Sequence, residues 1–348
     1  MESRGSVGKI EILNPTEQKD WNEVLNRTPD SSFFHTTNWA EVLRESYHYE
    51  PAYFTIRKQD ALQALLPVME VNSYLTGKRG VSLPFSDYCE PIVADKTQFQ
   101  KLFAAAIAFG KERHWRYLEL RGGRDFLDKA KPSEWHYAHT LDLGSIGIDK
   151  FSAATRRNIK KAEKQNIEVT ISTSQDALQT FCRLNALTRK YHGLPPQPRH
   201  FFQCVHERIF MRNMGFIVLA SLQGAAIAAN VYFTFGDQIL YKYGASDRTF
   251  QNLRASNLVM WEAIRWGRDH GYGSHCLGRT EPGNDGLRHF KMGWGAQEQV
   301  IRYYRYDLRN DTFIKTPNIV RPFHKKIFSK LPIPMLNLMG RLLYRHMG

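Results

Sequence analysis

The chain has 348 residues and a formal net charge of +14, from 48 Lys and Arg against 34 Asp and Glu. Because 42% of the residues are hydrophobic, there is enough apolar material for a packed core, which excludes disordered and low-complexity architectures. At roughly 150 residues per domain the length predicts about two domains, and the positive charge predicts a partner that carries phosphate or another anion.

In chain order, the hydrophobic periodicity predicts a first half of short helices and strands. A strand at 9–13 precedes helices at 16–26 and 37–46, strands at 53–58, 62–71 and 81–84, a helix at 97–113 and a strand at 117–121. The second half opens with a basic helix at 151–165. It continues with a strand at 168–172, helices at 176–190 and 199–213, and strands at 216–222, 225–235 and 238–244. The last elements are a helix at 256–270, a strand at 274–277, a short helix at 285–292 and a strand at 297–306.

Both halves follow the order helix, helix, three strands, helix, strand, which predicts an internal duplication. Residues 106–123 align without gaps on residues 263–280, an offset of 157, with four identities in 18 positions. The matching order of elements supports the duplication more than these identities do.

One uncharged stretch has the length of a membrane span. Segment 213–236 has no charged residue over 24 positions. However, Gln223 and Gly224 lie near its middle, and its second half alternates partly as a strand would. We therefore expect a buried hairpin.

The cysteines and the N-terminus indicate the compartment. The four cysteines are widely separated, with no CxxC motif and no Cys/His pair at zinc spacing, which favours a reducing environment. The thirteen histidines form no HExxH motif, so we expect no metal. Because segment 1–13 lacks the apolar core of a signal peptide, we expect a cytoplasmic protein.

Several motifs resemble those of one enzyme family. The first half contains FFHTTNWAEVL (33–43), SLPFSDYCEP (82–91) and YLELR (117–121). The second half contains TRRNIKKAEKQNIEV (155–169), YKYGASD (241–247), NLVMWEAIRWGRDHGY (257–272) and GLRHFKMGWGA (286–296). Together, over about residues 30–306, they resemble the FemAB-like branch of the GNAT acyltransferase superfamily.

This resemblance implies an α/β fold of two tandem GNAT-like (acyl-CoA N-acyltransferase fold) domains with mixed sheets, which we place at 1–145 and 146–310. The composition of residues 311–348 separately predicts a basic amphipathic tail. It implies transfer of an acyl or aminoacyl group to an amine of a cell-envelope precursor, in peptidoglycan or exopolysaccharide synthesis. The donor would be aminoacyl-tRNA or acyl-CoA, with no tightly bound cofactor. Two alternatives stay open: an acetyl-CoA-dependent N-acetyltransferase for a nucleotide- or lipid-linked amino sugar, and a non-catalytic protein that binds RNA or an anionic membrane.

Transfer to an amine needs positive charge or N–H donors at the developing oxyanion, but no covalent enzyme nucleophile. Lys291 matches the Phe-Lys of the family motif, so we expect it to neutralise the oxyanion or a substrate phosphate, while Phe290 shapes the pocket wall. A lysine that runs past Trp294 to solvent would give the same pattern. Asp87 and Tyr88 are expected to receive the substrate amine, with Asp87 as a candidate base, although turn chemistry explains them equally well.

The predicted basic helix at 151–165 places five cations within nine residues, 156–164. Such a run is usually a solvated face, but the resemblance favours phosphate contact through Arg156 or Arg157. Asn158 is expected to orient a substrate amide or to cap the helix.

A second phosphate contact is expected where the helix at 256–270 begins. In ordinary GNAT enzymes a glycine-containing loop holds the CoA pyrophosphate there. This chain has Arg254 and Ser256 in place of the glycines, which disfavours the usual mode of CoA binding. Arg254, with Arg248 nearby, is expected either to contact a phosphate directly or to cap a turn.

Three residues on strands are further candidates. Tyr241 and Tyr243 alternate along one strand, so we expect them to share a face that lines either the cleft or the core. Glu119 is a weaker acid–base candidate.

The tail combines basic and apolar residues. Residues 311–348 carry seven Lys and Arg against Asp311 alone, which is +6 of the +14. From Pro334 onward an apolar stripe is expected, formed by Met335, Leu338, Met339, Leu342 and Leu343 and flanked by Arg341 and Arg345. This pattern is typical of an interfacial helix on an anionic membrane, and equally of a helix that docks on its own domain. The expected partners are a phosphate-bearing envelope precursor, tRNA as donor, and the inner membrane face through residues 319–348.

Overall fold

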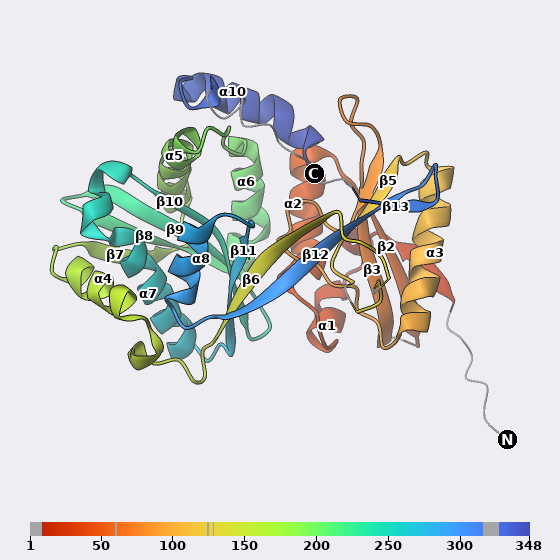
Figure 1. The fold of residues 1–348 in the computed structure, drawn as a ribbon, viewed down its shortest axis with the longest axis horizontal. Helices are drawn as coiled ribbons and strands as arrows, with labels where there is room; N and C mark the ends of the chain where they lie inside the picture. The colour runs from red at the N-terminus through yellow and green to blue at the C-terminus, as the bar shows by residue number, and fades with distance from the viewer. Residues whose placement is uncertain (1–8, 60, 124, 128, 316–326) are drawn as a thin grey trace. The chain divides into compact units, whose positions relative to one another are not determined.

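The computed structural model describes residues 9–59, 61–123, 125–127, 129–315 and 327–348. The chain forms two compact α/β units (Figure 1). Among the described residues, unit 1 comprises 9–135, 301–315 and 345–348, and unit 2 comprises 136–300 and 327–344.

Unit 1 is built on a mixed sheet covered by helices. In spatial order its strands are β1 (Ile10–Leu13), β2 (Glu50–Lys58), β3 (Ala61–Val71), β4 (Arg79–Val81), β5 (Tyr117–Arg121) and the second part of β12 (Gln297–Asp307), beside which lies β13 (Thr312–Ile314). Its helices are α1 (Trp21–Asn26), α2 (Thr37–Tyr47) and α3 (Lys96–Glu112). The apolar face of α3 (Phe99, Leu102 and Ala106) packs in one core cluster with Phe54 and Leu118 of the sheet.

Unit 2 repeats this plan. In spatial order its strands are β7 (Glu168–Ser172), β8 (Gly215–Leu222), β9 (Ala225–Phe235), β10 (Gln238–Ser246), β11 (Ser274–Thr280) and most of β6 (Glu134–Asp142). Its helices are α4 (Ala153–Glu163), α5 (Gln175–Tyr191), α6 (Arg199–Arg208), α7 (Ala255–Asp269), α8 (Asp285–Met292) and α10 (Ile333–Leu343). Helices α4 and α7 cover one face of the sheet, and α5 and α6 cover the other (Figure 1).

The strand pairing supports the predicted duplication. The order β1-β2-β3-β4-β5 in unit 1 corresponds to β7-β8-β9-β10-β11 in unit 2. In each run the first three pairs are antiparallel and the last pair, β4 with β5 or β10 with β11, is parallel.

The final strand of each half pairs in the sheet of the other half. β6 follows β5 in the sequence but pairs antiparallel with β11, with Leu141 opposite His275. β12 ends the second half but pairs antiparallel with β5, with Tyr304 opposite Leu120. The compact units therefore differ from the predicted division at residues 145 and 146, because each sheet takes its sixth strand from a distant part of the sequence.

The uncharged stretch 213–236 forms the predicted hairpin. It contains β8 and β9, which pair antiparallel around a turn in which Gln223 and Gly224 both have positive φ. Most of its side chains are buried in unit 2. Among the helices described, none is long and apolar enough to cross a membrane.

The C-terminal helix α10 docks on unit 2 through one face and exposes the other. Leu336 is fully buried, and Gly340 lies so close to the carbonyl oxygen of Pro196 that a side chain there would clash. After α10, the Tyr344 hydroxyl accepts a hydrogen bond from Arg189 at 2.7 Å. The last residues belong to unit 1, where Arg79 donates to the Gly348 carbonyl at 3.0 Å. Residues 316–326 of the predicted tail lie outside the described residues.

Candidate active site

The sheet of unit 2 opens between two parallel strands. β10 and β11 pair only from Gln238–Leu240 against Ser274–Cys276, although β10 continues to Ser246 and β11 to Thr280. After β10 the chain makes a short 3-10 segment (Arg248–Leu253) and then enters α7. The start of α7 therefore lies beside the end of β10, where the two strands have separated.

A pocket of about 390 Å³ lies at the start of α7. It is lined by α4, the end of α5, the end of β10, the loop 247–254 and α8. Its lining brings together three of the predicted site residues, Asn158, Arg254 and Phe290. The other lining residues are Thr188, Tyr191, His192, Ile227, Ser246, Asp247, Arg248, Phe250, Gln251, Ala255, Ser256 and Asn257. All of these residues belong to unit 2.

Arg254 occupies a backbone conformation that usually favours glycine. Its φ is +63°, in the left-handed region, and it precedes α7 without capping the helix through its side chain. Instead its carbonyl oxygen accepts from the Asn257 amide at 2.9 Å. The exposed guanidinium therefore stands at the positive end of a 15-residue helix. Both features favour an anion in this pocket.

Arg248 adds a second cation to the pocket wall. Its guanidinium lies 3.6 Å from the centre of the Tyr191 ring and donates to the Gln251 side chain at 3.3 Å. Tyr191 was not expected from the sequence, because it is 57 residues away from Arg248. Stacking on an aromatic ring leaves the edge of a guanidinium able to bind a phosphate.

The basic helix α4 contributes less than the sequence suggested. Arg156 turns back to its own chain and donates to the carbonyl oxygens of Asp149 at 3.0 Å and Phe151 at 2.9 Å. Arg157 is exposed and does not line the pocket. Of the three residues predicted here, the structure places only Asn158 in the pocket wall.

Lys291 is buried and bonded to the backbone. Its Nζ donates to the carbonyl oxygens of Gly278 and Arg279, both at 2.9 Å, and the residue is 2% exposed. Gly278 has a φ of +71° at a register shift of β11 against β6, which turns these carbonyl groups out of the ladder. The ammonium group thus joins α8 to the irregular end of β11, and it does not run past Trp294 to solvent.

An ion-pair cluster that the sequence did not reveal lies beside Lys291. Glu298 accepts two hydrogen bonds from Arg288, at 2.7 and 2.6 Å, and contacts His139 Nε2 at 3.0 Å. Burial, and then the charge of Lys291, lower the pKa of His139, so its ring is neutral at neutral pH and Nε2 donates to the carboxylate. Hydrogen bonding from Arg288 lowers the pKa of Glu298. The cluster fixes α8, which carries Phe290 and Lys291.

The two tyrosines of β10 face opposite ways, so the prediction of a shared face is wrong. The pairing of β10 with β9 shifts between Tyr241 and Tyr243. The centre of the Tyr241 ring lies 5.6 Å from that of Tyr232, in the core under α7. Burial raises the pKa of Tyr241 to about 12. Tyr243 instead packs under α5 and α6, with its ring 5.8 Å from that of Phe202. Neither lines the α7 pocket.

The remaining candidates lie in unit 1. The backbone oxygen of Asp87 accepts from the Tyr303 hydroxyl at 2.6 Å, and the Tyr88 hydroxyl donates to Glu90 at 2.5 Å. Glu119 is buried between two arginines: its carboxylate oxygens lie 2.9 Å from Arg121 Nε and 2.7 Å from Arg305 Nε. Burial alone would raise its pKa, but the two guanidinium groups lower it to about 2. Glu119 is therefore a permanently charged structural group, which argues against an acid–base role.

Part of the sequence matches a known protein family, and the match covers the unit that holds the α7 pocket. Residues 149–298 match the model of the acetyltransferase (GNAT) domain, and the whole of this range falls within unit 2. This match identifies residues 149–298 as a domain of the acetyltransferase (GNAT) family. No curated protein matches the sequence.

Among solved structures, FemX, a FemAB-family enzyme, is similar with a TM-score of 0.67 and 13% identity, over 84% of this chain and 96% of FemX. A tandem GNAT protein from the clavulanic acid biosynthesis pathway is similar with a TM-score of 0.56 and 10% identity, over 86% of this chain and 99% of that protein. The C-terminal domain of a putative lysylphosphatidylglycerol synthetase from Agrobacterium fabrum is similar with a TM-score of 0.55 and 11% identity, over 81% of this chain and 89% of that domain. These similarities confirm the predicted fold of two tandem GNAT-like domains.

Proposed function

We propose that this protein is an N-acyltransferase that transfers an acyl or aminoacyl group to an amine of a cell-envelope precursor. The observation that carries the proposal is the α7 pocket, which lies in the GNAT domain and joins Arg254, Arg248 and a helix N-terminus. Each of these groups favours a phosphate. The pocket would hold the phosphates of the donor, which is either an acyl-CoA or an aminoacyl-tRNA.

In the transfer, the neutral amine of the acceptor attacks the acyl carbonyl carbon. A C–N bond forms, the bond from that carbon to the donor's sulfur or oxygen breaks, and the proton lost by the amine ends on the departing sulfur or oxygen, which leaves as a thiol or an alcohol. Negative charge develops on the carbonyl oxygen, and N–H donors or a cation stabilise it. We propose that Lys291 supports this step by holding the irregular end of β11 in place. The resemblance to FemAB-like enzymes supports an acceptor from the peptidoglycan or polysaccharide pathways.

Arg254 provides the decisive test, because Arg254→Gly removes the guanidinium and also suits a φ of +63°. We expect this variant to bind acetyl-CoA or aminoacyl-tRNA about 10–100-fold more weakly, as for the loss of a charged hydrogen bond. Calorimetric titration of each donor measures this. Arg212→Ala, which removes an exposed arginine outside the pocket, is the control and should leave binding unchanged.

Three outcomes would count against the proposal or favour one of its alternatives. Unchanged or tighter donor binding by Arg254→Gly would remove Arg254 from the donor site and favour a backbone cradle. Absence of transfer from both donors to amino-sugar and peptide amines would favour the non-catalytic alternative. Selective transfer from acetyl-CoA to a nucleotide- or lipid-linked amino sugar would instead favour the acetyltransferase alternative.

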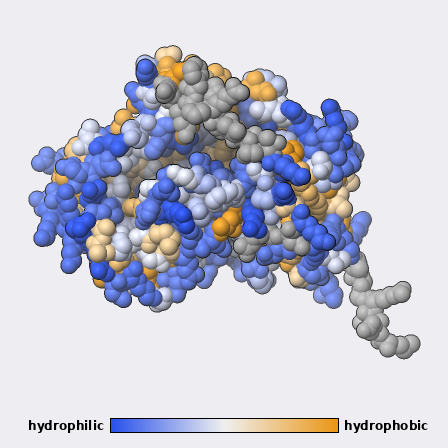
Figure 2. Space-filling view, in the orientation of Figure 1, coloured by the Kyte–Doolittle hydropathy of each residue, from blue (hydrophilic) through white to orange (hydrophobic). Residues whose placement is uncertain are grey.

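We also propose that α10 brings the protein to an anionic membrane surface on the cytoplasmic side. Its outward face exposes Met335, Leu338 and Leu342, each about half exposed, at helical spacing. Arg341 and Arg345 are exposed nearby. In Figure 2 hydrophobic atoms are visible at α10, at the top of the view, within a mostly hydrophilic surface. An apolar face next to basic residues is typical of a helix that lies on an anionic bilayer.

Sedimentation with vesicles tests the membrane proposal. The protein should bind vesicles that contain phosphatidylglycerol and should not bind pure phosphatidylcholine. Leu338→Glu should weaken the binding at least 10-fold without unfolding the protein, because Leu338 is 48% exposed. Equal binding by this variant, or equal binding to both vesicle types, would contradict the proposal.

A further inference from the structure

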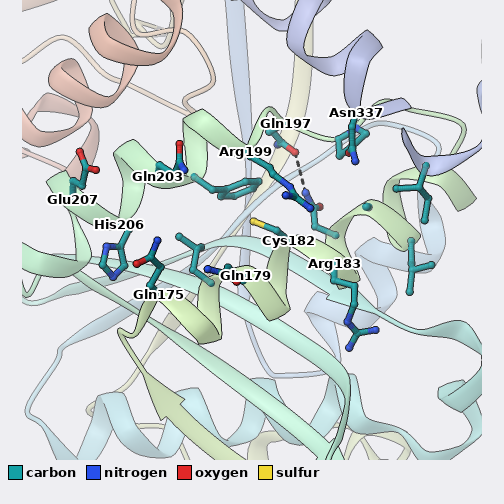
Figure 3. A pocket seen from close by; sticks show the side chains of 17 residues that line it. Gln175, Gln179, Cys182, Arg183, Gln197, Arg199, Gln203, His206, Glu207 and Asn337 are labelled. Carbon is teal, nitrogen blue, oxygen red and sulfur yellow. Dashed lines mark hydrogen bonds between the residues drawn. The ribbon is translucent and has the colours of Figure 1, made fainter. Parts of the chain in front are cut away.

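A second and larger pocket of unit 2 lies apart from the α7 pocket. Its volume is about 700 Å³, and it shares no lining residue with the α7 pocket. Its walls are α5, α6, the loop between them, and α10 (Figure 3). Neither the donor site nor the proposed membrane surface uses it.

Neutral carboxamide groups dominate the polar part of this pocket. Six of its 17 lining residues carry one: Gln175, Gln179, Asn185, Gln197, Gln203 and Asn337. One bond joins two of them, from Asn185 Nδ2 to Gln197 Oε1 at 3.3 Å (Figure 3). Asn185 is only 3% exposed, so the site has an ordered polar base. Each carboxamide offers a donor and an acceptor, and none carries a charge. We refer to this site as the carboxamide pocket.

The charged groups of the carboxamide pocket do not form an anion site. Arg183 donates to the carbonyl oxygen of Ala226 at 3.1 Å, and in Figure 3 it lies at the opposite end of the pocket from Glu207. The third charged residue of the lining, Arg199, carries the charge opposite to that of Glu207, so the two together add no net charge. Burial raises the pKa of Cys182 to about 12, so its thiol is neutral and not a nucleophile. These groups favour a ligand that is neutral along its length.

The apolar part of the lining separates two neutral ligand classes. Sugar rings bind best when an aromatic face is exposed for them to cover. The aromatic residue in this lining is Phe202, which is 2% exposed. The remaining apolar contacts come from small or aliphatic side chains, among them Leu178, Ala186 and Ile333. Such walls accommodate the side chains of a peptide better than a saccharide.

The length of the pocket also fits a peptide. Along α5 its lining runs from Gln175 to Leu187, which at about 1.5 Å per residue is about 18 Å. An extended chain rises about 3.3 Å per residue, so this length holds about five residues. The alternating N–H and C=O groups of such a chain match the donors and acceptors of the carboxamides.

We propose that the carboxamide pocket binds an extended, uncharged peptide segment of about five residues. Gln179 and Gln203, on facing helices, would bond to its backbone, and Asn337 would close one end of the site. Because the two pockets share no lining residue, a peptide bound here would leave the α7 pocket unoccupied.

Saturation-transfer NMR with an N-acetylated, C-amidated pentapeptide of alanine and glycine tests the proposal. We expect transfer to the peptide from the native protein. The double variant Gln179→Ala/Gln203→Ala should weaken binding at least 10-fold, and both side chains are exposed, so the fold should persist. The control Gln238→Ala/Gln297→Ala removes two exposed glutamines outside the pocket and should bind normally.

The competing ligands give the contrary results. Stronger transfer to chitopentaose than to the peptide would make this a saccharide site. Displacement of the peptide by inorganic pyrophosphate would place the peptide in the α7 pocket. Equal binding by the double variant and the native protein would also overturn the proposal. None of these results depends on whether the protein transfers an acyl group.

Discussion

Helices α3 and α7 occupy the same position in the two halves, yet they begin in opposite ways. At the start of α3 the carboxylate of Asp95 accepts the Gln98 amide at 2.8 Å. At the start of α7 stands Arg254, which makes no side-chain cap. The positive end of α3 is thus neutralised by its own chain, whereas that of α7 is left to a ligand. A few residues at the start of one helix are therefore enough to make one copy of a duplicated fold structural and the other suited to binding a ligand.

The charged side chains show a related contrast. In unit 1, Glu70 bonds Arg113 and Trp115, and Glu119 bonds two arginines. In unit 2, Arg254 and Arg248 face a pocket. Unit 2 also buries a structural charge, Lys291, but it keeps the two arginines at a pocket wall, where they are available for binding.

The largest effect should come from Glu119, the centre of the charge cluster in unit 1. Glu119→Gln leaves Arg121 and Arg305 without their buried carboxylate, so we expect a loss of about 3–5 kcal/mol in the free energy of unfolding. Glu134→Gln removes the more exposed partner of Arg305 and should cost less than about 1 kcal/mol. Urea denaturation measures both. Similar losses for the two variants would contradict a structural role for the cluster.

Lys291 should show the next largest effect, in unit 2. Lys291→Met leaves two buried carbonyl groups without a donor, which should cost about 3 kcal/mol. Transfer activity should fall in proportion to the disorder of α8, which hydrogen exchange of α8 and β11 can monitor. Normal exchange with activity lost entirely would instead favour direct contact between Lys291 and the reacting group.

His275 should make unit 2 sensitive to acid. Burial lowers its pKa to about 3, so the folded state keeps it neutral while the unfolded state takes up a proton below about pH 6.5. Stability should thus fall as the pH drops from 6.5 towards 3, by up to about 1.4 kcal/mol per unit. We expect His275→Phe to remove this contribution, measured as the urea midpoint at pH 7.5 and 5.0. Gln238→Ala, at an exposed site, removes no titratable group and should leave the slope unchanged.

Asp95 should give the smallest effect. Asp95→Ala removes the cap of α3 and should cost about 1 kcal/mol of stability. Donor binding should not change, because α3 lies in unit 1 and does not line the α7 pocket. Weaker donor binding in this variant would show that the division of work between the two helices is incomplete.

The long amphipathic helices and the central strands could be predicted from the sequence, since their apolar periodicity is strong. Strand β6 could not. Its buried positions include His136, Ala138 and His139, while Trp135 is exposed, so the usual alternation of apolar and polar residues is absent. The exchange of β6 and β12 involves pairing between distant segments, which local patterns do not encode.

The candidate site was predicted in part. Arg254, Asn158 and Phe290 could be found from residue type, position in a motif and resemblance. The opposite faces of Tyr241 and Tyr243 depend on a register shift that the sequence does not mark. The approach of His139 to Glu298 joins residues 159 positions apart, so no spacing rule could reveal it.

The crossed strands β6 and β12 have a consequence for how this chain can evolve. A cut at the midpoint would yield two fragments, each lacking the strand that completes its own sheet and carrying the one its partner needs. If recombination replaced one half of the chain, the new half would have to supply a final strand that pairs with the sheet of the retained half. Each half therefore needs a strand from the other to complete its sheet. Because neither half can be deleted alone, the two can continue to diverge in sequence within one chain.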